Sequence, residues 1–380
     1  MNTLGPLVSG GAGAGAPEEN TPRTRCGYLP HDCIRSFEKC LGQAGAVATG
    51  RALHFAADVV CSGGIDSLLR SLWDYSTAHV GLASPRIFVY LKKRTEEIQD
   101  ILRRLPDEQA YALEEFQVRI GELVLVTREA PTRTAVTWPK VGPETHGEGW
   151  IRSIGSSAPE TAALRRVWKP EGDLSILRTA GAEICKAISD GTTARALFWI
   201  KWLFEEEARA GKELKGAGLT TIDRGDGAKK GASVGGFIVA LFVEIYKELA
   251  TKEAVRMNEE FQVLVNLWKH GDKHIQGTAK RHILVILTQI LAEVPRWKVP
   301  AAQSLVKDPV AMSQAIRQVP KFFREVLAYD VPRGGQALVK AFRTRGKVDR
   351  AAAAAAKKGE AHLSQMDAFE RAMEAYFNRA

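Results

Sequence analysis

The sequence predicts a mainly α-helical protein built from multi-helix domains. Apolar residues recur three and four positions apart in most tracts, which is the spacing of one face of a helix. No series of alternating strands follows along the chain, and no repeat of fixed period is present. The 380 residues are 45% hydrophobic and 26% charged, and these values are typical of a globular protein with a buried core.

The first part of the chain is expected to be a disordered leader over residues 1–25, followed by a helical N-terminal domain over residues 26–140. The leader contains a run of glycine and alanine and no apolar segment. In the domain, a cap residue and a proline at Ser84-Pro85 are typical of a helix start. The expected helical stripes lie at residues 34–41, 68–75 and 85–105.

Residues 118–138 are compatible with either a small β element or a helix. Glu122–Thr127 has the composition of a strand, and Thr134–Trp138 could pair with it across a turn at Pro131-Thr132. A helix continuing from Glu114 accounts for the first of these segments equally well.

A connection rich in glycine and proline, residues 139–160, separates this domain from a helical C-terminal domain over residues 160–332. That domain contains a Gly/Lys-rich insert at 211–236, whose eight glycines indicate a solvated linker. Residues 333–380 are expected to form a basic linker and an amphipathic terminal helix. The helical tracts of the C-terminal domain are 174–189, 193–210, 237–268, 282–294 and 312–327.

Composition also limits the compartment. No apolar run reaches the roughly 18 residues that a membrane span needs. The start of the chain lacks the pattern of a secretory signal, and an odd number of cysteines, five, favours a reducing environment. We therefore expect an intracellular protein of the cytoplasm, the nucleus, a viral factory or a virion, and not a secreted one. The eight histidines are scattered and are expected at the surface, so no metal site is predicted.

The most specific motif is Ser-Gly-Gly-Ile-Asp-Ser at residues 62–67. It resembles the phosphate loop of the N-type ATP pyrophosphatases, which are ATP-dependent adenylating enzymes. The resemblance implies ATP and magnesium as cofactors. It assigns phosphate contacts to Ser62, Gly63, Gly64 and Ser67 and places Asp66 near the metal.

The residues around this motif favour a different interpretation. A phosphate loop should follow a buried parallel strand, but only Val59, Val60 and Cys61 are available for it. The favoured prediction is a turn between two helices, with Gly63 or Gly64 in the left-handed conformation and Asp66 or Ser67 capping the second helix. Whether a strand or a helix ends at Cys61 distinguishes the two interpretations.

Positive charge is concentrated near the end of the chain. The net charge of the protein is +9, and residues 340–358 alone carry seven cations against Asp349. Trp168 and Trp297 lie among arginines and lysines, and such rings can stack on the bases of single-stranded DNA or RNA; both tryptophans are equally compatible with a core position. The predicted nucleic-acid-binding residues are Lys340, Arg343, Arg345, Lys347, Arg350, Lys357, Lys358, Trp168 and Trp297.

The terminal amphipathic segment contains Met373, Tyr376 and Phe377. These residues resemble the core of a sliding-clamp binding box, although Glu370 stands where that box has glutamine. The segment is predicted to dock a sliding clamp or another replication protein, with docking on its own domain as the alternative. Val319-Pro-Lys-Phe-Phe323 matches the same loose pattern.

Four longer phrases are similar to uncharacterised helical proteins of large DNA viruses of algae and protists. They are residues 73–75, 83–91, 293–300 and 322–330. The first two also resemble the helical collar of clamp-loader subunits. The chain has no nucleotide-binding motif of a clamp-loader ATPase, so the resemblance extends to a non-catalytic part only.

Three functions follow as hypotheses. The first is a non-enzymatic helical protein that binds nucleic acid or a replication assembly through its basic tail and terminal helix. The second is an ATP-dependent adenylating enzyme that uses residues 62–67. The third is a structural or virion-associated protein.

Overall fold

The computed structural model describes residues 22–153, 159–213, 218–225, 232–251, 257–270, 274–275, 277–296, 305–330 and 335–343. Within these residues the elements are fifteen α-helices and a few shorter helical turns, with no strand, and this confirms the predicted helical fold class. The end of the predicted leader is part of the fold, because Thr24 and Arg25 are buried.

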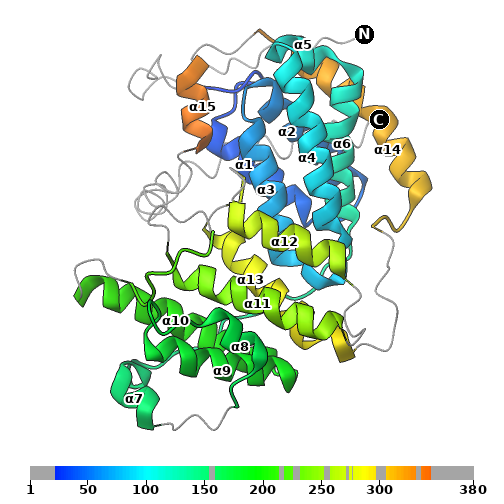
Figure 1. Ribbon diagram of the computed structural model, residues 1–380. Coiled ribbons are helices and arrows are strands. Elements are labelled where there is room, and N and C mark those ends of the chain that lie inside the picture. Colours follow the sequence, from blue (N-terminus) through cyan, green and yellow to red (C-terminus); the bar gives the residue numbers. More distant parts are fainter. Residues whose placement is uncertain are drawn as a thin grey trace.

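The first six helices form an N-terminal bundle (Figure 1). Within it α1 packs on α2, and both α2 and α4 pack on α6. Short turns connect these helices, which are α1 (Pro30–Leu41), α2 (Ala46–Cys61), α3 (Ile65–Tyr75), α4 (Arg86–Arg104), α5 (Asp107–Ala112) and α6 (Glu114–Glu129).

The next seven helices form a second group below the bundle in Figure 1. Here α9 packs on α10, and α8 packs on α11. Contacts of α12 with α4, and of α13 with the π-helical turn Ser76–Val80, join the two groups. The seven helices are α7 (Glu148–Ser153), α8 (Ala162–Val167), α9 (Ser175–Ser189), α10 (Thr193–Glu213), α11 (Val234–Ala250), α12 (Asn258–His270) and α13 (Thr278–Ala292).

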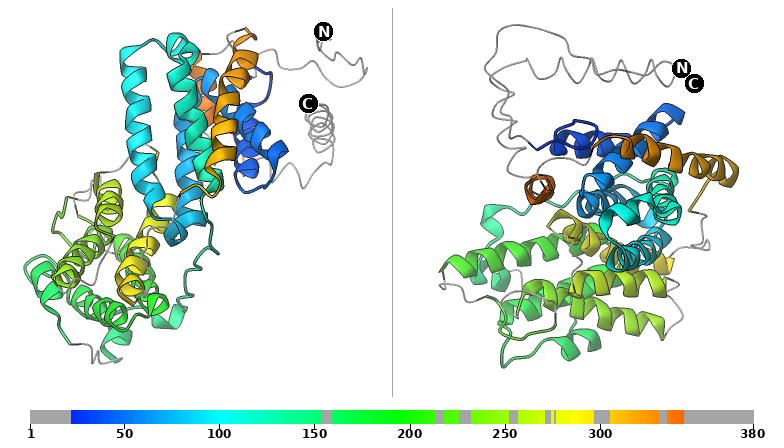
Figure 2. Two further views of the ribbon diagram at one scale, coloured as in Figure 1. Left: turned by 90° about the vertical axis from the view of Figure 1, so that its right-hand side faces the viewer. Right: turned by 90° about the horizontal axis from the view of Figure 1, so that it is seen from above.

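The last two helices return to the N-terminal bundle. α14 (Pro309–Leu327) packs on α2 and α6, and α15 (Gly335–Arg343) packs on α1. Figure 2 shows α14 on the outside of the bundle. The sequence grouped α14 with residues 160–332, but in the structure it belongs to the N-terminal helices by its contacts.

The β element considered near 118–138 is absent. α6 runs to Glu129, and residues 130–142 are irregular. The reason is that α6 lies between α2, α4 and α14, so Leu123, Val124, Leu125 and Val126 are all buried. A helical turn that is buried on every side gives the same continuous run of apolar residues as a buried strand.

The insert at 211–236 is shorter and better anchored than its composition predicts. α10 includes residues up to Glu213 and α11 begins at Val234. Between them, Arg224, whose side chain is 8% exposed, pairs with the buried Asp173, which also accepts a 2.6 Å hydrogen bond from Thr220. Residues 218–225 are therefore fixed on the second helix group, while 214–217 and 226–231 lie outside the described residues.

Candidate nucleic-acid interface

The motif at residues 62–67 is a turn between two helices. α2 ends at Cys61 and α3 begins at Ile65, so a helix precedes the motif where a phosphate loop needs a strand. Gly63 has a φ of +79°, as predicted for one of the two glycines. The N–H groups of Gly63 and Gly64 donate to the carbonyls of Val60 (2.9 Å) and Val59 (2.8 Å). Those donors close the end of α2 and do not point to an open phosphate site.

The predicted cap of α3 was wrong. The N-cap residue is Gly64, with no side-chain hydrogen bond, and both Asp66 and Ser67 lie inside α3. The carbonyl of Asp66 accepts a 3.2 Å hydrogen bond from Nδ1 of His274, whose side chain is fully buried. The expectation of surface histidines is therefore wrong for His274.

Ser62 belongs to a buried polar network. Its Oγ accepts from the Arg25 N–H (2.9 Å) and donates to Asp58 (3.3 Å), which is fully buried. Nε of Arg25 donates to the Cys61 carbonyl (2.8 Å), and the guanidinium also pairs with Glu108. Burial raises the pKa of the Cys61 thiol to about 12, so this thiol is neutral beside Arg25 at pH 7.

The other side of the turn holds α15. Val339 lies over Gly63 and Phe342 over Gly64, because a Cβ at either glycine would meet these side chains at 3.3 Å and 3.0 Å. Ser67 Oγ donates to the Phe342 carbonyl (3.3 Å). The motif therefore fixes the helix from which the basic segment begins.

The predicted basic residues divide between the described and the undescribed parts of the chain. Lys340 is exposed on α15, and Arg343 is the last residue of that helix. Outside the described residues lie Arg345, Lys347, Arg350, Lys357, Lys358, Trp297, Met373, Tyr376 and Phe377. The second match to the clamp-binding pattern is part of the core, because Val319 and Phe323 are buried.

Trp168 is half-buried beside cations that are already paired. Its Nε1 donates to the Leu174 carbonyl (3.4 Å), and the Arg178 guanidinium lies 5.2 Å from the ring centre. Arg178 is paired with Glu160, and Arg166 with Glu244. Base stacking by Trp168 stays a prediction, and these arginines already have acidic partners.

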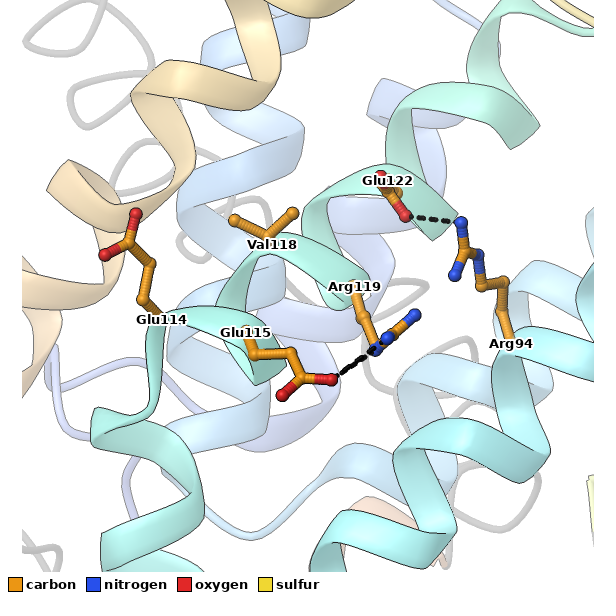
Figure 3. Close-up of a pocket in the computed structure, with 6 residues that line it drawn as sticks. All are labelled: Arg94, Glu114, Glu115, Val118, Arg119 and Glu122. Atoms are coloured by element: carbon orange, nitrogen blue, oxygen red, sulfur yellow. Dashed lines mark hydrogen bonds and ion pairs between the residues drawn. The ribbon is translucent and has the colours of Figure 1, made fainter.

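A groove of about 540 Å³ lies between α4 and α6 (Figure 3). Its two arginines are both paired, Arg94 with Glu122 at 3.0 Å and Arg119 with Glu115 at 2.9 Å. With Glu114 also at its edge, the groove carries more acid than base and is a poor site for a phosphate.

Another charged cluster lies on α10. The almost fully buried Glu206 accepts a 2.7 Å hydrogen bond from Nδ1 of His146 and another from the Gly147 N–H (3.2 Å), and it pairs with Arg209. Burial raises the pKa of the Glu206 carboxyl, but these hydrogen bonds outweigh that effect and hold the pKa below its ordinary value. The cluster fixes the 142–147 segment on α10.

Sequence reasoning missed the outer face of α14. Arg317, Lys321 and Arg324 are exposed there, and none of them forms an ion pair with another described residue. These residues are four and three positions apart and lie on the side of the helix opposite Val319 and Phe323. This pattern of one charged face is visible in the sequence.

Comparison with protein-family models, with curated proteins and with solved structures finds no match. Among the described residues, no group of three or more histidine, cysteine, aspartate or glutamate side chains is arranged to hold a metal ion. Over the same residues, none of the helices combines the length and apolar character needed to cross a membrane.

Proposed function

We propose that the protein is a non-enzymatic helical protein associated with nucleic acid or with a replication assembly, and that its basic segment at 340–358 contacts phosphates. The observation that carries the proposal is the concentration of seven cations against one acid in this segment. Lysine and arginine clusters of this kind release counterions from DNA or RNA on binding, which makes binding strong at low salt and weak at high salt.

The anchoring of α15 supports the proposal. Leu338 and Phe342 are buried, while Lys340 on the same helix is exposed. The first cation of the segment is therefore held at the surface by a packed helix. A contact made by a pre-positioned side chain loses less conformational entropy on binding than one made by a free chain.

Filter binding to single-stranded and double-stranded DNA over a salt series tests the proposal. The test variant of the full chain changes the cations beyond α15 to glutamine, at Arg345, Lys347, Arg350, Lys357 and Lys358. Its matched control exchanges arginine and lysine at the same five positions and so keeps the charge. We expect the glutamine variant to lower the slope of log K against log salt by up to about 4.5 on duplex DNA, and the control to keep it.

Absence of wild-type binding at low salt would refute nucleic-acid binding. An unchanged slope in the glutamine variant would refute the role of the basic segment.

We also propose that the amphipathic segment ending in Met373, Tyr376 and Phe377 docks a sliding clamp or another replication protein. The support is its apolar pattern at helical spacing. Fluorescence anisotropy of a labelled clamp with the full chain tests this. The triple alanine variant at these positions should lose binding, and binding that survives in this variant contradicts the proposal.

A further inference from the structure

We propose that the outer face of α14 is a second phosphate-binding surface, along which one strand of a nucleic-acid duplex lies on Arg317, Lys321 and Arg324. This inference rests on the proposed function and extends it to a rigid helix of the folded bundle. The surface is called the α14 stripe below and consists of these three residues.

The stripe lies opposite the packed side of α14. Consecutive residues of a helix are about 100° apart, so the three cations fall within about 60° of the circumference. The buried residues Met312, Val319, Phe323 and Val326 occupy the other side. The three exposed cations therefore lie together on the solvent side of α14. Figure 2 shows α14 on the outside of the bundle.

The charges of the stripe are not paired with acids in the described part of the chain. Many other cations have acidic partners on their own or a neighbouring helix, as Lys92, Arg103, Arg166, Lys186 and Lys247 do. The stripe has no ion pair within the described residues. Glu325 of α14 lies beside the stripe, and its carboxylate interacts electrostatically with His54 in α2. Unpaired cations keep their full attraction for phosphates.

Two exposed apolar side chains mark the ends of the same helix. Val310 is 68% exposed and Tyr329 is 56% exposed, and they are the most exposed large hydrophobic residues in the described part of the chain. Val310 is in the first turn of α14, and Tyr329 comes two residues after Leu327, the last residue of that helix. Apolar and aromatic groups beside a row of cations fit a partner that offers sugars and base edges next to its phosphates.

Both ends of α14 are fixed to the protein. Asp308 Oδ1 caps the first turn by accepting from the N–H groups of Val310 (2.9 Å) and Ala311 (3.0 Å). The carbonyl of Tyr329 accepts a 3.2 Å hydrogen bond from Arg25. The stripe is therefore pre-organised, and binding costs little backbone entropy.

The spacing of the stripe suits a duplex backbone. At a rise of 1.5 Å per residue, the seven steps from Arg317 to Arg324 cover about 10.5 Å. Duplex DNA advances about 3.4 Å along its axis for each base pair, so the stripe covers about three base-pair steps. The three cations are therefore spaced to reach phosphates within a few base pairs of a duplex that lies along α14.

Salt-dependent binding of the full chain to duplex DNA tests the inference. The test variant is Arg317→Gln, Lys321→Gln, Arg324→Gln. The control, Lys93→Gln, Lys140→Gln, Arg281→Gln, removes the same charge from three exposed positions on separate elements. We expect the slope of log K against log salt to fall by about 2.7 in the test variant and to stay at the wild-type value in the control. Both variants should keep the wild-type melting temperature.

The outcomes separate this inference from the proposed function. If the α14 variant keeps the wild-type slope, the inference about the α14 stripe is overturned and the proposal for the basic segment stands. The same holds if the slope falls equally in the control variant. Failure of the wild-type chain to bind any nucleic acid overturns both. Binding to phosphatidylserine vesicles that the α14 substitutions abolish, with duplex binding unchanged, would identify a lipid surface as the partner and overturn the inference.

Discussion

The hydroxyl of Ser67 donates a 3.3 Å hydrogen bond to the backbone carbonyl of Phe342, and the two residues are 275 positions apart in the sequence. This bond connects the glycine turn after α2 with the helix that begins the basic segment. The motif that looks most like a nucleotide loop thus packs against the end of the described chain.

Substitutions at the two glycines of this turn should destabilise the fold. Gly63→Ala places a Cβ at a φ of +79° and 3.3 Å from Val339, and the left-handed conformation alone costs about 1–2 kcal/mol. Gly64→Ala brings a Cβ to 2.9 Å from the Val59 carbonyl oxygen and should cost about 1–3 kcal/mol. Urea unfolding measures both.

The matched control is Gly149→Ala in α7, where a Cβ meets nothing within 4 Å. It should be neutral or stabilise by up to about 1 kcal/mol, because alanine favours a helix over glycine. Equal unfolding free energies for all three variants would contradict the geometry of the turn at Gly63 and Gly64.

The buried polar network around Arg25 and Ser62 predicts that Arg25 and Glu108, the two partners of one ion pair, contribute unequally to the free energy of unfolding. The Arg25 side chain is 3% exposed and its partner Glu108 is 53% exposed. Arg25→Ala leaves the carbonyls of Cys61 and Tyr329 without this donor and should lower the free energy of unfolding by about 2–4 kcal/mol. Glu108→Gln should cost less than about 1 kcal/mol, because an amide oxygen still accepts and solvent reaches that side. A larger loss for Glu108→Gln in urea unfolding would contradict this assignment.

The sequence was sufficient for the helical class and for the glycine turn, because both depend on local spacing and local backbone preference. Prediction from the sequence failed where tertiary contacts determine the secondary structure or the burial of a residue. The run Leu123–Val126 has the pattern of a strand and is buried on all sides of a helix. Arg25 is the last residue of the predicted leader, and its burial depends on Cys61, Glu108 and Tyr329.

The candidate nucleic-acid-binding residues also divide into those that local sequence predicts and those that only tertiary contacts identify. Clustered cations at 340–358 are visible in the sequence as a run. The α14 stripe is spaced out along a helix, and its exposure depends on which side of α14 packs against α6. The contact between Val319 and Gly121, together with the burial of Met312, Phe323 and Val326, identifies the other side as the surface.

Acid should destabilise the attachment of the 142–147 segment to α10. The hydrogen bonds to Glu206 hold its pKa below the ordinary value of 4.5, so the carboxylate contributes stability that is present above pH 4.5. That stability is lost as the pH falls through the lower pKa of the folded state. The melting temperature measured from pH 7 to pH 3 should therefore fall less steeply below pH 4.5 in Glu206→Gln than in the wild type. Glu205→Gln, at a more exposed position, should keep the wild-type profile, and a wild-type profile for Glu206→Gln would contradict the prediction.

The close approach of α6 and α14 depends on a glycine. A Cβ at Gly121 would lie 2.2 Å from Cγ2 and 2.8 Å from Cγ1 of Val319, and the β-branched valine has little freedom to move away. Gly121→Ala gains up to about 1 kcal/mol of helix propensity. The overlap should outweigh that gain and leave a net loss of about 1–3 kcal/mol.

A double-mutant cycle distinguishes this overlap from a general effect on α6. Val319→Ala alone should also destabilise the protein, because it leaves a cavity between the two helices. In the double variant the added methyl group occupies part of that cavity, so the combined loss should be smaller than the sum of the single losses by about 0.5–3 kcal/mol. Strict additivity in urea unfolding would show that the two positions do not touch, and α14 would then need another site on the bundle.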